Sequence, residues 1–426
     1  ALTVVLAVSS LLLNSEHFTA RLTPRALLGW NFLFVLLLVL TILPHQIAFP
    51  PARELYPLDE PAVSPLAGIF LFLMLLASPV LLVDFMFFTR QISSEKPSLQ
   101  QLGKSFAIAA LFLLIMIFFH VFTTIYDYAS IIGPVFRDRF WFVYLLAGLG
   151  MGLPVLLLRK ETFPPGKPDM AMPFTLLALG TLALLSVAAL YLTAARPVTP
   201  QSSAPLKIMT YNIQQGVDTE GNKNLELQLA VIRQMDPDIL GLQESDLARI
   251  ANGNVDAIRY FADNLDMYSY YGPKTTTGTF GIALLSKYPI QNPETFFMYS
   301  PAEQTATIRA EIVKGGRTYQ IFVTHLGNGG PLFQLEDMLT RIRGRENVIA
   351  MGDFNFRPTT DQYALMTQTL ADSWLVKWPG GKEIPGFSPE RRIDHIFVSP
   401  NLTVLESEYG VSPASDHPYI FVVIGP

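Results

Sequence analysis

The distribution of hydrophobic residues divides the chain near residue 200. Before that point, long apolar runs alternate with short polar connections that contain proline. Each run can cross about 30 Å of hydrocarbon as a helix, so the pattern predicts membrane-spanning helices rather than buried helices of a soluble protein. The five longest runs cover residues 26–43, 66–88, 105–126, 140–158 and 173–195.

A further apolar run at residues 1–13 is short for a span, which needs about 20 apolar residues. The chain begins with Ala, and we expect its natural N-terminus to have been lost. We interpret the run as a trimmed transmembrane helix, with the remnant of a signal peptide as the alternative. Residues 1–195 are therefore expected to form an all-α membrane bundle of about six spans.

The pattern changes between residues 206 and 426, where short β-rich runs alternate with helical runs. Helices are predicted at 224–235 and 331–344, because apolar residues recur there at three-to-four spacing. Polar motifs follow the apolar strands, which favours a two-layer sheet sandwich flanked by helices, with a site at one end. The predicted strands cover residues 206–213, 238–244, 281–290, 305–314, 318–326, 347–355, 392–399 and 419–424.

The segment RPVTPQSSAP at residues 196–205 connects the two halves. Its Pro and Ser content is typical of a short, semi-extended linker. Such a linker is too short to let the following domain move far. We therefore expect the active site of the C-terminal domain to stay near the bilayer surface.

Lys and Arg are distributed unevenly among the predicted loops. Loops 14–25, 89–104 and 159–172 together hold eight of these residues, whereas loops 44–65 and 127–139 hold three. Because basic residues accumulate in cytoplasmic loops, the first set is expected to face the cytoplasm. The segment after the last helix then lies on the opposite side, which predicts an extracytoplasmic catalytic domain.

Several polar or aromatic residues have two interpretations. Asp84 lies in a predicted span. It has either a functional role, in contact with a lipid headgroup or in proton transfer, or a structural role as an interfacial or helix-packing residue. His120 is interpreted as a packing or interfacial residue. The tyrosines Tyr268, Tyr270 and Tyr271 form either a rim that faces lipid or part of a strand core, and the second interpretation is favoured.

Charge and cysteine content narrow the chemistry of the C-terminal half. From residue 201 onward there are 18 Lys/Arg and 25 Asp/Glu, a net charge of −7. A polyanion such as duplex DNA needs compensating cations, so this balance disfavours nucleic acid as the partner. The chain contains no Cys, which excludes disulfides, thiolate nucleophiles and Cys-type zinc sites.

Six polar motifs follow hydrophobic stretches in the C-terminal half. Together they supply four carboxylates, two amides and two histidines with candidate roles, an inventory that suits divalent-metal phosphoester cleavage. The motifs are TYNIQQG (210–216), GLQES (241–245), THLG (324–327), GDFN (352–355), RIDHIFVS (392–399) and SDHPYI (415–420).

The acids that follow two of these stretches are candidate metal ligands. Hard cations such as Mg²⁺ take oxygen ligands, few of them from the protein. Glu244 and Asp416 are therefore the first-choice ligands, although a cap at a strand end is the alternative role for Glu244. Asn212 is expected to hold a phosphate oxygen or to orient a metal-bound water. Mg²⁺ is the expected cofactor, with Mn²⁺ and Ca²⁺ as alternatives.

The GDFN motif carries two further candidates, Asp353 and Asn355. Side chains alternate along an extended segment, so both are expected to point the same way. Such a pair can hold an attacking water and a phosphoryl oxygen. The alternative is an Asx turn that caps the next helix.

The histidines of the motifs are candidates for proton transfer and charge stabilisation. His417 is the predicted general base, because a neutral imidazole can take a proton from water near neutral pH. Asp394 is expected to fix its tautomer. His325 is expected to donate a hydrogen bond to a non-bridging phosphate oxygen. His395 alternates to the other face of its strand and is interpreted as structural.

On these six motifs, residues 205–426 resemble the endonuclease/exonuclease/phosphatase superfamily, which includes deoxyribonuclease I, neutral sphingomyelinases and inositol-phosphate phosphatases. The resemblance implies a four-layer α/β sandwich of the deoxyribonuclease I type and Mg²⁺-dependent phosphoester hydrolysis. The implied roles are metal and phosphate binding for Asn212 and Glu244, phosphate contact for His325, nucleophile and transition-state positioning for Asp353 and Asn355, metal binding for Asp416, and base function for His417 paired with Asp394.

Residues 241–290 are also similar to the C-terminal domain of eukaryotic membrane proteins that remodel GPI-anchor lipids to ceramide. Those proteins likewise place this domain after many transmembrane helices. The similarity implies a phospholipid or glycolipid substrate in the membrane.

Three functional hypotheses follow. The leading one is a membrane-anchored, metal-dependent phosphodiesterase or related transferase that acts on a lipid phosphoester, including GPI-anchor lipid remodelling or transfer to ceramide. The second is a membrane-tethered extracytoplasmic nuclease. The net charge of −7 disfavours it, and so does the Ser245-Asp246 pair after Glu244, where several nucleases have a basic residue. The third is an inactive lipid-binding scaffold, which the complete set of motifs disfavours.

Overall fold

The structure is a computed structural model. It describes residues 2–13, 21–45, 52–62, 64–124, 139–158, 172–193, 204–248, 252–274, 280–301 and 304–426, and the single residues 15, 18 and 135. The chain divides into two compact units, which are treated separately below. The first unit comprises residues 1–47, 62–123 and 134–193, and the second comprises residues 48–61, 124–133 and 194–426. Most of the predicted linker 196–205 lies outside the described residues.

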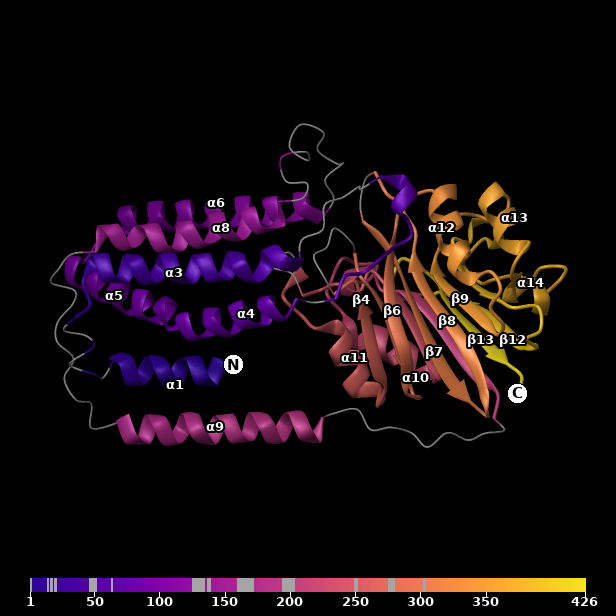
Figure 1. Cartoon of the computed structure of the whole chain (residues 1–426), viewed down its shortest axis with the longest axis horizontal. Coiled ribbons are helices and arrows are strands. Elements are labelled where there is room, and N and C mark those ends of the chain that lie inside the picture. The colour runs from indigo at the N-terminus through magenta and orange to yellow at the C-terminus, as the bar shows by residue number, and fades with distance from the viewer. Residues whose placement is uncertain are drawn as a thin grey trace. The chain divides into compact units, whose positions relative to one another are not determined.

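The first unit is built from apolar helices (Figure 1). Among the described residues, five segments are long and apolar enough to cross a membrane: Pro24–Ile42, Pro65–Glu95, Leu99–Val121, Phe140–Leu157 and Pro173–Leu192. These match the five long runs predicted from the sequence. The helices are α1 (Leu2–Leu13), α3 (Pro24–Ile42), α4 (Pro65–Ala77), α5 (Pro79–Glu95), α6 (Leu99–Thr124), α8 (Phe140–Gly152) and α9 (Met172–Leu192).

The sixth expected span corresponds to α1, which has 12 residues. At 1.5 Å per residue, such a helix is shorter than the hydrocarbon thickness. The second span is continuous in sequence but is divided at Pro79, which begins α5 directly after the C-cap Ser78 of α4. Proline removes one backbone donor, which explains the break at this point.

A polar contact lies inside the first unit. Asn31 on α3 donates a hydrogen bond from Nδ2 to Asp84 Oδ1 on α5 at 3.2 Å, and both side chains are buried. Apolar residues such as Val80 and Phe87 pack around them. His120 is buried on α6, where its ring lies against those of Phe140 and Tyr144. The packing interpretation therefore describes the environment of both ionisable residues.

The second unit contains two mixed β-sheets that pack face to face. Gly241 and Met351 meet between the sheets, where a Cβ on Gly241 would lie 3.1 Å from the sulfur of Met351. Among the described residues, one sheet has seven strands in the order β1 (Leu58–Asp59), β6 (Ile290–Met298), β7 (Thr305–Lys314), β8 (Arg317–His325), β9 (Val348–Asp353), β11 (Asp394–Val398) and β10 (Ala371–Asp372). The other has six, in the order β12 (Val404–Gly410), β13 (Tyr419–Ile424), β2 (Leu206–Asn212), β3 (Ile239–Gln243), β5 (Ile282–Ser286) and β4 (Tyr268–Gly272).

Helices cover the outer face of each sheet (Figure 1). The amphipathic helices α10 (Leu225–Met235) and α11 (Ala257–Leu265) pack on the six-stranded sheet, and α12 (Leu332–Ile342) and α13 (Asp361–Thr367) pack on the seven-stranded sheet. A short helix, α14 (Ser373–Lys377), follows β10. Burying an apolar helix stripe on each sheet accounts for the layers. The expected fold class, a helical membrane region followed by a four-layer α/β sandwich, is confirmed.

A strand from the sequence between α3 and α4 was not predicted. Leu58 and Asp59 form β1, which pairs antiparallel with Phe297 and Phe296 at the edge of the seven-stranded sheet. We call residues 52–61 the connector. Two residues carry too little periodicity to predict a strand. The connector thus belongs to the same compact unit as residues 194–426.

Candidate active site

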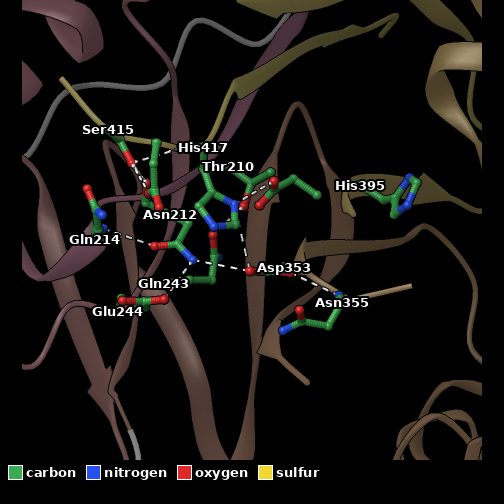
Figure 2. A network of polar contacts seen from close by, with 12 residues as sticks. Thr210, Asn212, Gln214, Gln243, Glu244, Asp353, Asn355, His395, Ser415 and His417 are labelled. Atoms are coloured by element: carbon green, nitrogen blue, oxygen red, sulfur yellow. Dashed lines mark hydrogen bonds and ion pairs between the residues drawn. The ribbon is translucent and has the colours of Figure 1, made fainter. Parts of the chain in front are cut away.

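Strand direction brings four of the predicted side chains together, and Figure 2 shows three of them, Asn212, Glu244 and Asp353. β2 runs parallel to β3, and β8 runs parallel to β9. Asn212 ends β2 and Glu244 directly follows β3, while His325 and Asp353 end β8 and β9. The carboxyl ends of parallel neighbours lie at the same sheet edge, so the polar motifs meet where the two sheets face each other.

Asp394 reaches the same edge from an antiparallel strand. β11 begins at Asp394, which is paired in register with Asp353 at the end of β9. The neighbouring Tyr409 donates a hydrogen bond from its hydroxyl to the Asp394 carbonyl oxygen at 2.8 Å. The start of one strand and the end of its partner therefore bring two buried carboxylates together.

Asp353 lies at the centre of the cluster. Its side chain is 2% exposed. Asn212 Nδ2 donates to Asp353 Oδ2 at 3.2 Å and also to Glu244 Oε1 at 3.3 Å, so one amide links the two acids. His325 Nε2 lies 3.6 Å and His417 Nδ1 lies 3.8 Å from Asp353 Oδ2.

His417 and Asp394 form a close pair. His417 Nδ1 lies 2.8 Å from Asp394 Oδ2. Burial of the His417 ring opposes its protonation, but the charges of Asp394, Asp353 and Asp416 outweigh burial and raise its pKa to about 10. Burial raises the pKa of Asp394, and the His417 charge partly offsets that rise. The predicted pairing is present, while the carboxylates favour the imidazolium over the neutral ring expected from the sequence.

The donor set fits a hard divalent cation. One ligand atom from each of Asp353, Asp394 and His417 lies within 4.8 Å of the others. Among the described residues, the buried Oδ1 of Asp394 has no hydrogen-bond partner. Carboxylate oxygens are the ligands that Mg²⁺ prefers. Glu244, joined to Asp353 through Asn212, adds another carboxylate beside this group.

The predicted ligands Glu244, Asp416 and Asn212 occupy different environments. Asn212 is fully buried and accepts a hydrogen bond at Oδ1 from the Gln214 backbone N–H at 3.0 Å. Glu244 is partly exposed and has a left-handed φ of 50°. Asp416 is exposed, and the hydroxyl of Ser415 lies 3.5 Å from its Oδ1. The structure thus gathers Glu244 and Asn212 with Asp353, and it places Asp416 on the exposed side of the last motif.

The extended geometry expected for the GDFN motif was wrong beyond Asp353. The strand ends at Asp353, and Asn355 has a left-handed φ of 54°. Its backbone N–H donates to Asp353 Oδ1 at 2.9 Å, and its side chain donates to the Leu326 carbonyl oxygen at 2.8 Å. An Asx turn explains this geometry, because a short acid accepts from the backbone two residues later. Asn355 therefore fixes the loops around Asp353 in this structure.

Two residues that the sequence did not single out position the last motif. Ser415 is buried, and its hydroxyl donates to the Asn212 carbonyl oxygen at 2.7 Å. Gln228 on α10 is fully buried and donates to the carbonyl oxygens of Ile213 and Ala414. The only available signal for Ser415 was its place beside Asp416. Gln228 had none, because a polar residue in an amphipathic helix is usually solvated.

His395 is structural, as expected. It is fully buried and points away from the cluster (Figure 2). Its Nε2 lies 3.2 Å from the Phe356 carbonyl oxygen, and its ring stacks on that of Phe356 at 5.7 Å. Burial lowers the pKa of His395 to about 4, which keeps the ring neutral.

Comparison with known proteins agrees with the resemblance predicted from the motifs. Residues 203–367 match the model of a family described as "PGAP2IP, C-terminal nuclease-like domain". The chain is 27% identical over 231 residues to Protein cwh43 of Schizosaccharomyces pombe (strain 972 / ATCC 24843). That match covers 49% of this chain and 23% of the relative, so the chain spans only part of the relative's length.

Two solved structures are similar to about half of this chain at low identity. The catalytic domain of human Nocturnin with bound sulfate anion is 22% identical and has a TM-score of 0.43, over 54% of this chain and 99% of that chain. The endonuclease/exonuclease/phosphatase from Beutenbergia cavernae DSM 12333 is 20% identical and has a TM-score of 0.40, over 52% and 72%. This chain is therefore a multi-pass membrane protein whose C-terminal, phosphoesterase-like domain is similar to the PGAP2IP C-terminal nuclease-like domains.

Proposed function

We propose that the protein is a membrane-anchored, metal-dependent phosphodiesterase or related transferase that acts on a lipid phosphoester. The observation that carries the proposal is the cluster of the buried Asp353 and Asp394 with the partly buried His417, joined through Asn212 to Glu244. The five candidate spans of the same chain favour a substrate in the bilayer. The predicted similarity to proteins that remodel GPI-anchor lipids supports a glycolipid, with transfer to ceramide as one reaction of this class.

In this proposal, Glu244, Asn212 and Asp416 hold a divalent cation, Mg²⁺ first and Mn²⁺ or Ca²⁺ as alternatives. When bound, the cation supplies Lewis-acid stabilisation of charge on the phosphoryl oxygens. The carboxylates of Asp353 and Asp394, which lie together beside His417, offer a competing position for the same cation. Metal binding measured on Glu244→Gln and Asp394→Asn separates the two positions, because only the variant that removes a ligand should weaken binding by tenfold or more (about 1.4 kcal/mol).

The remaining residues have roles set by their contacts. Asp394 fixes the orientation of the His417 ring through the 2.8 Å contact at Nδ1, which directs Nε2 toward an attacking hydroxyl. His417 accepts the proton of water, or of an incoming lipid alcohol, once the local negative charge that favours its imidazolium is compensated. Asp353 orients that hydroxyl. His325 donates to a non-bridging phosphoryl oxygen.

The side of the membrane is part of the proposal. The bias of Lys and Arg among the loops supports an extracytoplasmic catalytic domain. The connector and β2 belong to the same compact unit, so both must lie on one side of the membrane. Four candidate spans separate them, and an even number of spans returns the chain to the same side, which supports this topology. Protease protection of the C-terminal domain in sealed vesicles tests this side.

The test of function is mass spectrometry of a lipid panel incubated with the detergent-purified full chain, with Mg²⁺ or with EDTA, beside a plasmid-DNA control. The panel holds phosphatidylinositol, GPI-like glycolipids and sphingomyelin, with added ceramide. We expect metal-dependent lipid conversion and intact DNA, and the product separates hydrolysis from transfer. DNA cleavage with untouched lipids would instead identify a tethered nuclease. No conversion of either would favour an inactive lipid-binding scaffold.

A further inference from the structure

A single row of paired residues crosses the seven-stranded sheet from the connector to the candidate active site. Each member of the row pairs with the next, and the members are Leu58, Phe297, Ala306, His325, Asp353 and Asp394. Paired residues lie directly opposite each other on neighbouring strands, so β1 lies at the same end of the sandwich as the candidate active site. We call the end that holds Asn212, His325 and Asp353 the active-site end.

The length of the chain after β1 keeps this end close to a membrane. Asp59 ends β1, and the candidate span Pro65–Glu95 begins six residues later. Six extended residues reach at most about 20 Å. The ten residues of β7 extend about 33 Å between the two ends of the sandwich. Six residues are therefore too few to reach the bilayer if the opposite end of the sandwich faces it.

The exposed apolar side chains of the second unit are concentrated at the active-site end. Among the described residues of this unit, eight large apolar side chains are exposed. Five of them lie at the active-site end, and they are Leu55, Val255, Tyr271, Leu332 and Val411. Single exposed apolar residues are ordinary, whereas their concentration at one end indicates an interaction surface.

Two of these five side chains lie beside the seven-stranded sheet. Leu332 begins α12, seven residues after His325, and is 42% exposed. Leu55 is 59% exposed and lies two residues after Arg53, whose guanidinium is 4.9 Å from the centre of the Phe333 ring. The connector therefore approaches the start of α12, and both contribute exposed apolar groups to this end.

The other three lie beside the six-stranded sheet. Tyr271 is the second-last residue of β4, whose last residue shares a row of pairs with Asn212. Val255 donates its backbone N–H to the loop that follows β3. Val411 directly follows β12, at the point where β12 pairs with the start of β13. Both sheets thus present apolar groups at the active-site end.

The opposite end of the sandwich has the character of a surface in water. Lys207, at the start of β2, lies 3.0 Å from Asp236 Oδ2, and Lys287 lies 2.5 Å from Oδ1 of the same acid. Charged groups lose hydration when they enter an apolar medium, so this end suits water. Leu405 lies near this end, because the start of β12 pairs with the last residue of β13.

We propose that the active-site end is a surface that docks on the lipid bilayer, where Leu55, Leu332 and Tyr271 enter the headgroup region. The partner is a bilayer because the chain that leaves β1 continues into a candidate span. Tyrosine suits this position, since its ring is amphipathic and is common at membrane interfaces. Docking in the headgroup region also leaves water around exposed acids such as Asp416.

Docking in this orientation brings a lipid phosphoester to the polar cluster without removing the lipid from the bilayer. That consequence rests on the proposed function, whereas the docking surface itself does not require turnover. The surface therefore has to be tested by a measurement of lipid contact.

The test uses single cysteines, because the natural chain contains no Cys. A fluorophore is attached at Leu332→Cys or Tyr271→Cys in the full chain, which is embedded in phosphatidylcholine nanodiscs. The matched controls are Leu405→Cys and Val376→Cys, whose natural side chains are 38% and 46% exposed, against 42% and 53% for the first two. The nanodiscs contain a lipid that carries a nitroxide quencher near its headgroup.

We expect the nitroxide lipid to quench the fluorophores of Leu332→Cys and Tyr271→Cys at least about threefold more than those of the controls, because interfacial groups lie about 5–10 Å into the headgroup boundary. Equal quenching at all four positions overturns the docking surface. Fluorophores that are shielded from aqueous iodide but are not quenched by the lipid overturn it as well, since protein then covers this end.

The same measurement separates this inference from the proposed function. If quenching follows the expected pattern and the lipid panel shows no turnover, the docking surface stands and the proposed function fails. If lipid is converted while quenching is equal at all four positions, the docking surface fails and the proposed function stands.

Discussion

The two units of this chain place their apolar side chains in opposite directions. On α9, Leu184 is 73% exposed and Leu177 is 68% exposed, whereas Phe322, Phe354 and Phe397 of the sandwich are fully buried. The helices present an exposed apolar surface that suits the hydrocarbon of a bilayer, while the sandwich buries its own core. The comparison indicates that a bilayer covers the apolar side chains of the first unit, whereas packing between sheets and helices covers those of the second.

Polar groups follow the same division. Asn31 and Asp84 satisfy each other between two helices of the first unit. In the second unit, Asp353 and Asp394 bring like charges together beside His417 at a sheet edge, and the buried Oδ1 of Asp394 has no hydrogen-bond partner among the described residues. An isolated polar pair serves packing, whereas crowded carboxylates are typical of a binding or catalytic site.

The largest expected effect comes from breaking the polar cluster of the sandwich. His417→Ala or Asp353→Ala should lower kcat on the lipid substrate by about 10³-fold, because each removes a group that handles the attacking hydroxyl. Circular dichroism should show that both variants keep their fold. As the matched control, Asn31→Leu in the first unit should leave kcat within about threefold. Full turnover in either cluster variant would remove these residues from the mechanism.

The next effect tests the two kinds of apolar surface directly. Phe397→Ala should destabilise the C-terminal domain by about 3–5 kcal/mol, because it leaves a cavity in a close-packed core. Leu184→Ala removes a similar apolar group from a side chain that is already exposed on α9, and it should change denaturant stability by less than about 0.5 kcal/mol. Equal losses for the two variants in urea titrations would mean that α9 packs against protein.

The pH dependence of domain stability should reveal the buried histidine. His395 has a folded pKa of about 4, below its ordinary value of 6.5, so the unfolded chain binds more protons between these values. The contribution of neutral His395 to the free energy of unfolding is therefore fully present above pH 6.5. It falls as the pH drops through 4, by roughly 3 kcal/mol in total. His395→Gln can still donate to the Phe356 carbonyl oxygen but does not titrate. Its urea midpoint should fall less between pH 6.5 and 4, and an unchanged profile would assign the dependence to other groups.

The smallest effect concerns the connector, which lies between α3 and α4 in the sequence but belongs to the second unit. Arg341 pairs with Asp59 and lies 3.5 Å from the Pro57 carbonyl oxygen, and Arg53 lies 3.2 Å from Glu336. Replacing residues 57–60 with Gly and Ser should remove β1 and cost the domain about 1–2 kcal/mol, since exposed ion pairs and edge hydrogen bonds contribute little each. Hydrogen exchange should rise along β6, which loses its edge partner. If the amides of β6 stay as protected from hydrogen exchange as in the wild-type chain, the pairing of β1 with β6 is contradicted.

Periodicity was enough to predict much of the fold. Helices expected at 224–235 and 331–344 correspond to α10 and α12, because an amphipathic stripe is a local property of the sequence. The strands that end in motifs were predicted for the same reason. The very short β1 and α14 were missed, since such elements depend on pairing with distant segments rather than on their own pattern. The longer β6, β12 and α11 were missed as well, and the strand predicted at 281–290 ends at Ser286 as β5.

The site was predictable as a set of residues but not as a geometry. The motifs identified Asp394 and His417, and their 2.8 Å contact agrees with the predicted pairing. Local alternation failed at Asn355, where an Asx turn interrupts the strand. Neither the hydrogen bond from Ser415 to Asn212 nor the one from the Lys274 backbone N–H to the Glu60 side chain has a local signature in the sequence.

The amino-acid pattern alone shows which segments avoid water and which residue types can perform phosphoester chemistry. Both properties are local, since an apolar run or a strand-end acid has the same chemistry in any fold. Which acids meet depends on the fold, because β9 and β11 must pair antiparallel before Asp353 and Asp394 lie together. That pairing concentrates their negative charge around His417, and the charge rather than the ring's own chemistry raises its pKa.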